Sequence, residues 1–308
     1  MTAPLRGTQS VVDQMGWIFS RPRLTLIELA WRWTFGVPFL YVCWLQLKQI
    51  LVAVPLESSG VNAINAQNPW QASTQLAHVW AVYQPHAVVA LSWIAPVGAL
   101  AWVIVSGLGR SLLLKRLAAE SGALVRFRTV SMMVLQAGWL TLFGAMCWGW
   151  FSAMRWVSNT HITEGQEPDL IGFAAWSIFL SLGFFTLWAL VSWIFSIGPL
   201  VMLGEDRSAL SAIGTSFKLG REFTGKLIEI NLVMGIVNLA LIVLAMVLSA
   251  APLPFSDQLG AEALHRIAAL AVLFYFVASD YFQVVRLKGF QEFWKTYRGS
   301  QSASQRVS

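Results

Sequence analysis

The sequence predicts an all-α, polytopic membrane protein with six transmembrane helices, together with cytoplasmic and interfacial amphipathic helices. Composition is the first observation behind this prediction: 56% of the 308 residues are hydrophobic and only 12% are charged. Soluble domains carry about 25% charged residues, so this chain has too few of them to cover a surface that faces water. The second observation is a series of long apolar runs, and the third is that basic residues gather between alternate runs.

Six runs are long and apolar enough to cross a hydrocarbon core of about 30 Å as helices. They cover residues 26–54, 87–109, 130–155, 171–203, 227–251 and 266–286. The first residues lack the apolar region and cleavage site of a secretory signal, so we expect the first run to serve as its own insertion signal. The predicted parts are a cytoplasmic amphipathic segment at 1–25, a six-helix transmembrane bundle at 26–286 and a cytoplasmic tail at 287–308.

The basic residues predict how the helices are oriented. Most of the 21 Lys and Arg residues lie before the first run, between the second and third, between the fourth and fifth, or after the sixth. In contrast, the long loop at residues 55–86 contains neither Lys nor Arg. Loops rich in Lys and Arg stay on the cytoplasmic side of a membrane. We therefore expect both termini to be cytoplasmic.

Three segments outside the runs have apolar residues at helical spacing, which is typical of helices that lie in the membrane interface. They are Leu76, Val79, Trp80 and Tyr83 on the outer side, and Val12, Met15 and Phe19 as well as Leu210, Ile213 and Phe217 on the cytoplasmic side. Arg21 and Arg23 follow the first cytoplasmic segment, and we expect them to lie among anionic lipid headgroups.

A ten-residue phrase occurs twice: LSWIAPVGAL begins at Leu91, and VSWIFSIGPL begins at Val191. Both copies lie in runs that the charge pattern orients in the same direction. One interpretation is a parallel repeat, in which the protein is built from hairpins of two spans. The alternative is chance, because apolar segments rich in Trp match one another easily.

Ionisable and amide side chains inside the runs form a candidate polar network. Its predicted members are Glu28, Arg32, Glu229, Asn231 and Asp280. Charges at this depth are costly and must find partners, so we expect Arg32 to be shared among the three carboxylates. The network has two interpretations: a structural ion network, or a site for a lipid headgroup or an ion.

Small residues recur at every fourth position of the third run and predict a helix-packing stripe. The stripe consists of Ala137, Thr141, Ala145, Gly149 and Ala153. Small side chains let a second helix approach closely in lipid. The partner is either another helix of this chain or a second copy of it.

Residues 197–237 contain a further pattern: a run that ends near Pro199, an acidic pair at Glu205–Asp206, and a small-residue helix with Ala212 and Ser216. This segment resembles the membrane domain attached to glycerophosphoryl diester phosphodiesterases and its relatives in bacterial inner membranes. The resemblance implies a six-span protein of the bacterial cytoplasmic membrane. It transfers no catalytic residue, because the activity of those enzymes belongs to a separate soluble barrel with no counterpart here.

We predict no catalytic residue, metal site or cofactor, because no nucleophile–base or metal-ligand spacing occurs. The four histidines, His78, His86, His161 and His265, lie on or near the outer side. A zinc site built from them with Glu164, Glu167 or Asp169 has no spacing in its favour. The favoured function is a non-enzymatic module: a scaffold, a partner subunit or a lipid-organising protein. The alternatives are a transporter or lipid-handling channel, and an intramembrane enzyme. Expected partners are membrane lipids with anionic headgroups, and a protein partner or second copy; nucleic acid is not expected.

Overall fold

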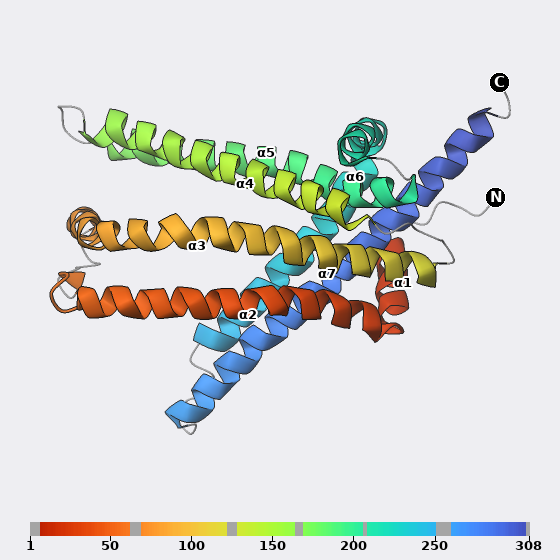
Figure 1. The fold of residues 1–308 in the computed structure, drawn as a ribbon. Coiled ribbons are helices and arrows are strands. Elements are labelled where there is room, and N and C mark those ends of the chain that lie inside the picture. The colour runs from red at the N-terminus through yellow and green to blue at the C-terminus, as the bar shows by residue number, and fades with distance from the viewer. Residues whose placement is uncertain are drawn as a thin grey trace. The chain divides into compact units, whose positions relative to one another are not determined.

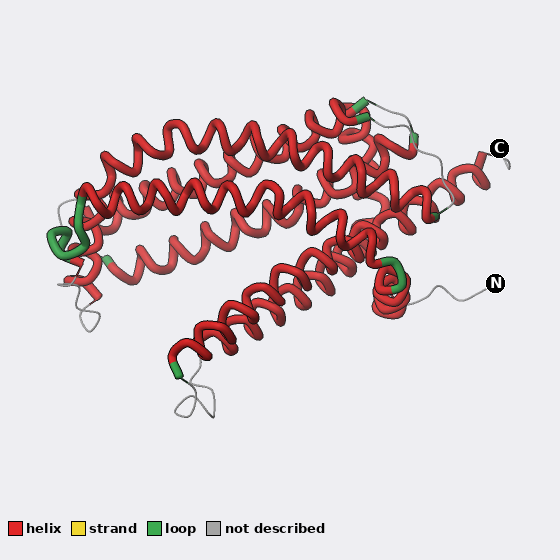
Figure 2. Tube along the Cα trace, turned by 60° about the horizontal axis from the view of Figure 1, so that its bottom comes forward, coloured by secondary structure: helices red, strands yellow, loops and turns green. Residues whose placement is uncertain are grey.

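The computed structural model describes residues 7–61, 69–121, 128–163, 169–205, 208–250 and 260–305. Within these ranges the chain is helical and has no strand, as Figure 1 and Figure 2 show. The α-helices are α1 (Gly7–Phe19), α2 (Pro22–Ala53), α3 (Pro69–Glu120), α4 (Thr129–Ser158), α5 (Leu170–Gly204), α6 (Ala209–Ala250) and α7 (Ala261–Gln305), and α4 is followed by the short π-helix η2 (Asn159–Thr163). The predicted all-α fold is confirmed.

Five helical segments within the described ranges are long and apolar enough to cross a membrane, as a multi-pass membrane protein requires. They are Pro22–Ala53, His78–Glu120, Thr129–His161, Ile171–Trp188 and Glu262–Lys295. The remaining predicted span, 227–251, lies in α6. There the described side chains cover the apolar segment Leu232–Val247.

The helices are longer than the predicted spans. The segment at residues 76–83 does not form a separate interfacial helix but belongs to the first part of α3. Although Pro85 lies inside α3, the helix continues for 52 residues, about 78 Å at a rise of roughly 1.5 Å per residue. The tail predicted after residue 286 continues α7 as far as Gln305. The predicted spans end where the sequence stops being apolar. The helices α3 and α7 continue past those points, because no capping residue or helix breaker ends them there.

Packing divides the chain into two compact units. The first contains residues 1–30 and 107–308, and the second contains residues 31–106. The second unit holds most of α2 and α3. Its Tyr83 hydroxyl donates a hydrogen bond to the carbonyl of Val54 over 3.2 Å, and a Cβ on Gly98 would lie 2.5 Å from the ring of Phe39. The predicted boundaries at residues 25 and 286 follow membrane topology, a different property from these packing boundaries.

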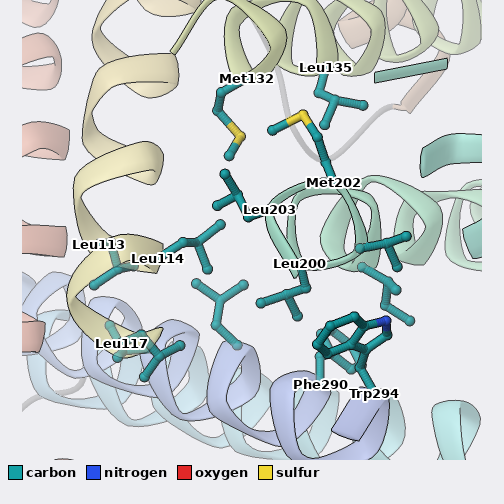
Figure 3. Packing of buried hydrophobic residues seen from close by; sticks show 14 of the residues in the cluster. Leu113, Leu114, Leu117, Met132, Leu135, Leu200, Met202, Leu203, Phe290 and Trp294 are labelled. Atoms are coloured by element: carbon teal, nitrogen blue, oxygen red, sulfur yellow. The ribbon is translucent and has the colours of Figure 1, made fainter. Parts of the chain in front are cut away.

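In the first unit, α4 runs beside α5 and α6 runs beside α7 (Figure 1). Their buried side chains form one hydrophobic cluster with those of α1 and the end of α3. Figure 3 shows Leu113, Leu114 and Leu117 of α3, Met132 and Leu135 of α4, Leu200, Met202 and Leu203 of α5, and Phe290 and Trp294 of α7. We call the end of these helices that holds this cluster the core end. Away from it, many large apolar side chains of the spans are exposed, Trp148 and Phe179 among them.

The two amphipathic stripes predicted for the cytoplasmic side turn away from this core only in part, because Met15 and Ile213 pack against it. On α1, Val11, Gln14 and Ile18 are buried, whereas Phe19 is 81% exposed. At the start of α6 the small residues Ala209, Ala212 and Ser216 are buried, whereas Leu210 and Phe217 are exposed. Small residues let α6 approach the core closely, so the larger apolar side chains are left facing the surroundings.

Candidate functional site

The most highly connected polar group at the core end is the ammonium of Lys288 on α7. Lys288 is only 6% exposed. Its Nζ donates to Glu292 Oε1 at 2.6 Å, to Ser121 Oγ at 3.1 Å and to Gln291 Oε1 at 3.3 Å. An ammonium has three donors, so this group is saturated. We call Lys288, Ser121, Gln291 and Glu292 the Lys288 cluster.

The indole of Trp17 on α1 links the Lys288 cluster to a second cation. The Lys288 ammonium lies 4.2 Å from its ring centroid, and the Arg21 guanidinium lies 4.0 Å from it. Arg21 also contacts Glu120 at the end of α3 over 3.3 Å. Cation–π contacts of this kind contribute about 0.5–2 kcal/mol each. Because both cations contact partners on neighbouring helices, the arrangement joins α1, α3 and α7.

A second contact holds α1 against α7. The Tyr281 hydroxyl donates a hydrogen bond to the carbonyl of Met15 over 2.8 Å. Gly289 lies two turns further along α7, and a Cβ built on it would lie 2.8 Å from Gln14 Oε1. The absence of a side chain at Gly289 therefore lets α1 lie directly on α7.

The members of the predicted polar network differ in how they are placed. Glu28 and Asp280 are buried in the first unit, and each takes part in a polar or electrostatic interaction. Arg32 belongs to the second unit and lies with its guanidinium 5.5 Å from the ring centroid of Trp31. The side chains of Glu229 and Asn231 lie outside the described residues. A network shared by all five residues stays a prediction.

The small-residue stripe on α4 contacts α5 at one of its members. A Cβ on Gly149 would lie 3.1 Å from the ring of Phe184 on α5. Ala137 and Ala153 are partly buried, whereas Thr141 and Ala145 are exposed. The hairpin partner therefore covers only part of the stripe.

Aromatic side chains make the rest of the α4–α5 contact. The ring of Trp188 on α5 packs edge-on against Trp139 and Phe143 of α4, with centroid separations of 5.6 and 5.4 Å. The indole N–H of Trp150 donates to Ser181 Oγ over 2.9 Å. These aromatic side chains join the two helices to each other.

At the opposite end of the hairpin, Asp169 caps the N-terminus of α5. Its Oδ1 accepts a hydrogen bond from the Gly172 N–H over 2.9 Å, and its Oδ2 lies 3.2 Å from His161 Nδ1. The Gly172 N–H is the main cause that holds the pKa of the Asp169 carboxyl below its usual value. Among the described residues no three His, Cys, Asp or Glu side chains are grouped to hold a metal; Glu164 and Glu167 lie outside those ranges.

This cap predicts a pH dependence. A carboxyl whose pKa is lowered by folding stabilises the fold above its unfolded pKa, near 3.8, and the contribution is lost as the pH falls through the lower folded pKa. We expect the Gly172 amide resonance to shift with a midpoint below 3.8. Asp169→Asn, which keeps a capping oxygen, should remove the titration and retain the helix start. An unchanged titration in Asp169→Asn would contradict the assignment.

The Lys288 cluster was not predicted from the sequence, where Lys288 counts only as one basic residue of a tail. A signal for it does exist. Lys288, Gln291 and Glu292 are spaced i, i+3, i+4 and share one face of a helix. The apolar residues Leu287, Phe290 and Trp294 flank that face, and the structure buries all three.

Comparison of the chain with protein-family models, with curated proteins and with solved structures found no match. The resemblance of residues 197–237 to bacterial inner-membrane proteins therefore stays a prediction.

Proposed function

We propose that this chain is a non-enzymatic module of the bacterial cytoplasmic membrane that organises lipids around its helices. The observation that supports the proposal is the distribution of burial. The main core cluster lies at one end of the helices, whereas the apolar middle parts of the spans expose large side chains such as Trp148 and Phe179. Apolar surface of this extent needs lipid or another protein to cover it.

The orientation belongs to the same proposal. Basic residues concentrate at the core end, which the positive-inside rule assigns to the cytoplasmic side together with both termini. The exposed apolar side chains of α1 and of the start of α6, Phe19 and Leu210 among them, would then enter the inner leaflet. Arg21 and Arg23 follow α1 and would lie at the level of anionic headgroups.

A transporter or lipid-handling channel is the second candidate. It is favoured by the buried carboxyl groups of Glu28 and Asp280 in segments that we treat as membrane-spanning. Ionisable groups at that depth commonly belong to a substrate or ion pathway. The pairing of α4 with α5 and of α6 with α7 is also compatible with construction from hairpins.

Native mass spectrometry of the chain extracted from its own membrane with a lipid-retaining polymer tests the proposal. We expect a reproducible set of phospholipids, enriched in anionic ones over the bulk membrane, to stay bound. A polypeptide bound at fixed stoichiometry would replace the lipid-organising role with that of a partner subunit. A chain that retains no lipid and moves a solute into sealed liposomes would contradict the proposal and support the second candidate.

A further inference from the structure

Arg286 on α7 is a partly buried cation whose charge is not balanced by the described residues around it. Within the described part of the chain it has no carboxylate partner. Its one hydrogen bond there runs from Nη2 to Ser196 Oγ at the long distance of 3.5 Å. Its Nε–H is shielded from solvent and has no acceptor among the described residues. A guanidinium has five N–H donors, so most of its hydrogen-bonding capacity is unused.

A second cation lies close to the first. The charge of Arg110, on α3, acts on that of Arg286 and opposes it. The ring of Phe290 also faces Arg286, with its centroid 5.4 Å from the guanidinium carbon, and it supplies no negative charge. A partly buried cation without a carboxylate partner costs free energy, and an anion bound at Arg286 would offset that cost. The three polar residues, Arg110, Ser196 and Arg286, come from α3, α5 and α7, next to the core cluster.

We propose that Arg286, together with Ser196 and Arg110, binds the phosphate group of an anionic phospholipid. A guanidinium offers two parallel N–H groups that match two phosphate oxygens, and the Ser196 hydroxyl adds a third donor. All three residues are partly exposed, so the site is open to a headgroup. Basic pockets between transmembrane helices on the cytoplasmic side are suited to such lipids. The inference rests on the proposed lipid-organising function and gives it a specific binding site.

The unbalanced charge makes a two-part prediction for the variant Arg286→Gln. In nanodiscs of phosphatidylcholine, which has no net charge, the variant should melt at a higher temperature than the wild type, because it removes an uncompensated cation. In nanodiscs that contain phosphatidylglycerol, the wild type should gain thermal stability by mass action and the variant should gain much less. Affinity for phosphatidylglycerol, measured by lipid titration and native mass spectrometry, should fall about tenfold or more.

Two further variants separate the site from general effects of charge. Arg266→Gln removes an arginine from the same helix, but one that is exposed and paired with Glu262 at 2.6 Å; its response to phosphatidylglycerol should equal that of the wild type. Arg286→Lys keeps the charge and loses the planar fork, so it should bind with intermediate affinity. This variant keeps the test decisive if Arg286→Gln does not fold.

Equal responses of wild type and Arg286→Gln to phosphatidylglycerol would overturn the proposal. Inorganic phosphate added to the phosphatidylcholine nanodiscs distinguishes the two sources of the anion. If phosphate stabilises the wild type through Arg286 and phosphatidylglycerol does not, the lipid assignment is overturned and the ligand is a soluble anion. These experiments test the Arg286 site with defined lipids, whereas the proposed function is tested by identifying the lipids that stay bound after extraction from the native membrane. The Arg286 site can therefore fail its test while the lipid-organising function passes, and the reverse.

Discussion

Glu292→Gln is expected to lower the free energy of unfolding by about 2 kcal/mol, because the buried Lys288 ammonium loses its counter-charge. The Lys288 side chain is 8% exposed, and its Nζ lies 2.6 Å from Glu292 Oε1. Removing one partner of a fully buried pair costs about 3–5 kcal/mol. The expected loss is smaller here because the Glu292 side chain is 44% exposed, so water screens part of the interaction.

The same helix provides a matched control. Glu262 and Arg266 on α7 form an i, i+4 pair with the same 2.6 Å separation, but their side chains are 81% and 74% exposed. Glu262→Gln should therefore change the free energy of unfolding by no more than about 0.5 kcal/mol. Both variants can be measured by unfolding in mixtures of mild detergent and dodecyl sulfate, followed by circular dichroism. Equal losses in the two variants would show that the burial of Lys288 does not determine the effect.

Gly107→Ala is expected to destabilise the protein by about 1–3 kcal/mol through overpacking. A Cβ at this position of α3 would lie 2.5 Å from Met133 Cγ, and 3.1 and 3.2 Å from the Met133 Cα and backbone nitrogen. Two of these three atoms belong to the backbone of α4, which cannot rotate away as a side-chain tip can. The end of α3 would have to move away from α4, and contacts in the core cluster would be lost.

Gly144→Ala on α4 is the control for the intrinsic effect of the substitution. Nothing lies within 4 Å of a Cβ built at Gly144. Alanine favours a helix interior over glycine by about 0.5–1 kcal/mol, so this variant should be neutral or slightly more stable. Thermal unfolding in detergent compares the two. A Gly107→Ala protein as stable as Gly144→Ala would mean that α3 and α4 do not approach this closely.

The sequence was informative about which segments are helical and apolar, and less informative about their ends. Hydropathy can be calculated from a short stretch of sequence without knowledge of the fold. The spans around Phe39, Trp93 and Trp148 are therefore predicted correctly as helix. The ends are different. The amphipathic segment at residues 76–83 is joined to the following span as one helix, α3, because no glycine or cap separates them and Pro85 alone does not end the helix.

The candidate sites depended on which residues meet across helices, and spacing along one helix does not give that information. The stripe that includes Ala145 and Gly149 follows from a periodicity of four, but the structure brings Gly149 against Phe184 and leaves Ala145 exposed. Lys288 and Ser121 are separated by 167 positions, so only the fold brings them together. The residues of the proposed phosphate site likewise come from three different helices.

By itself, the sequence determined that this protein is a helical, multi-pass membrane protein. A segment that lies in lipid must be a long apolar helix, and the mean hydropathy of each segment can be read directly from its residues. Tertiary structure alone decided which face of each helix turns inward. At the start of α6, Leu210 and Phe217 are exposed and the smaller Ala212 and Ser216 are buried, whereas on α1 the buried face combines Ile18 with Gln14 and leaves Phe19 exposed. Lipid accepts large apolar side chains as readily as a protein core does, so hydrophobicity cannot distinguish the two faces of such a helix. At the start of α6, close helix packing selects the face with the smaller residues.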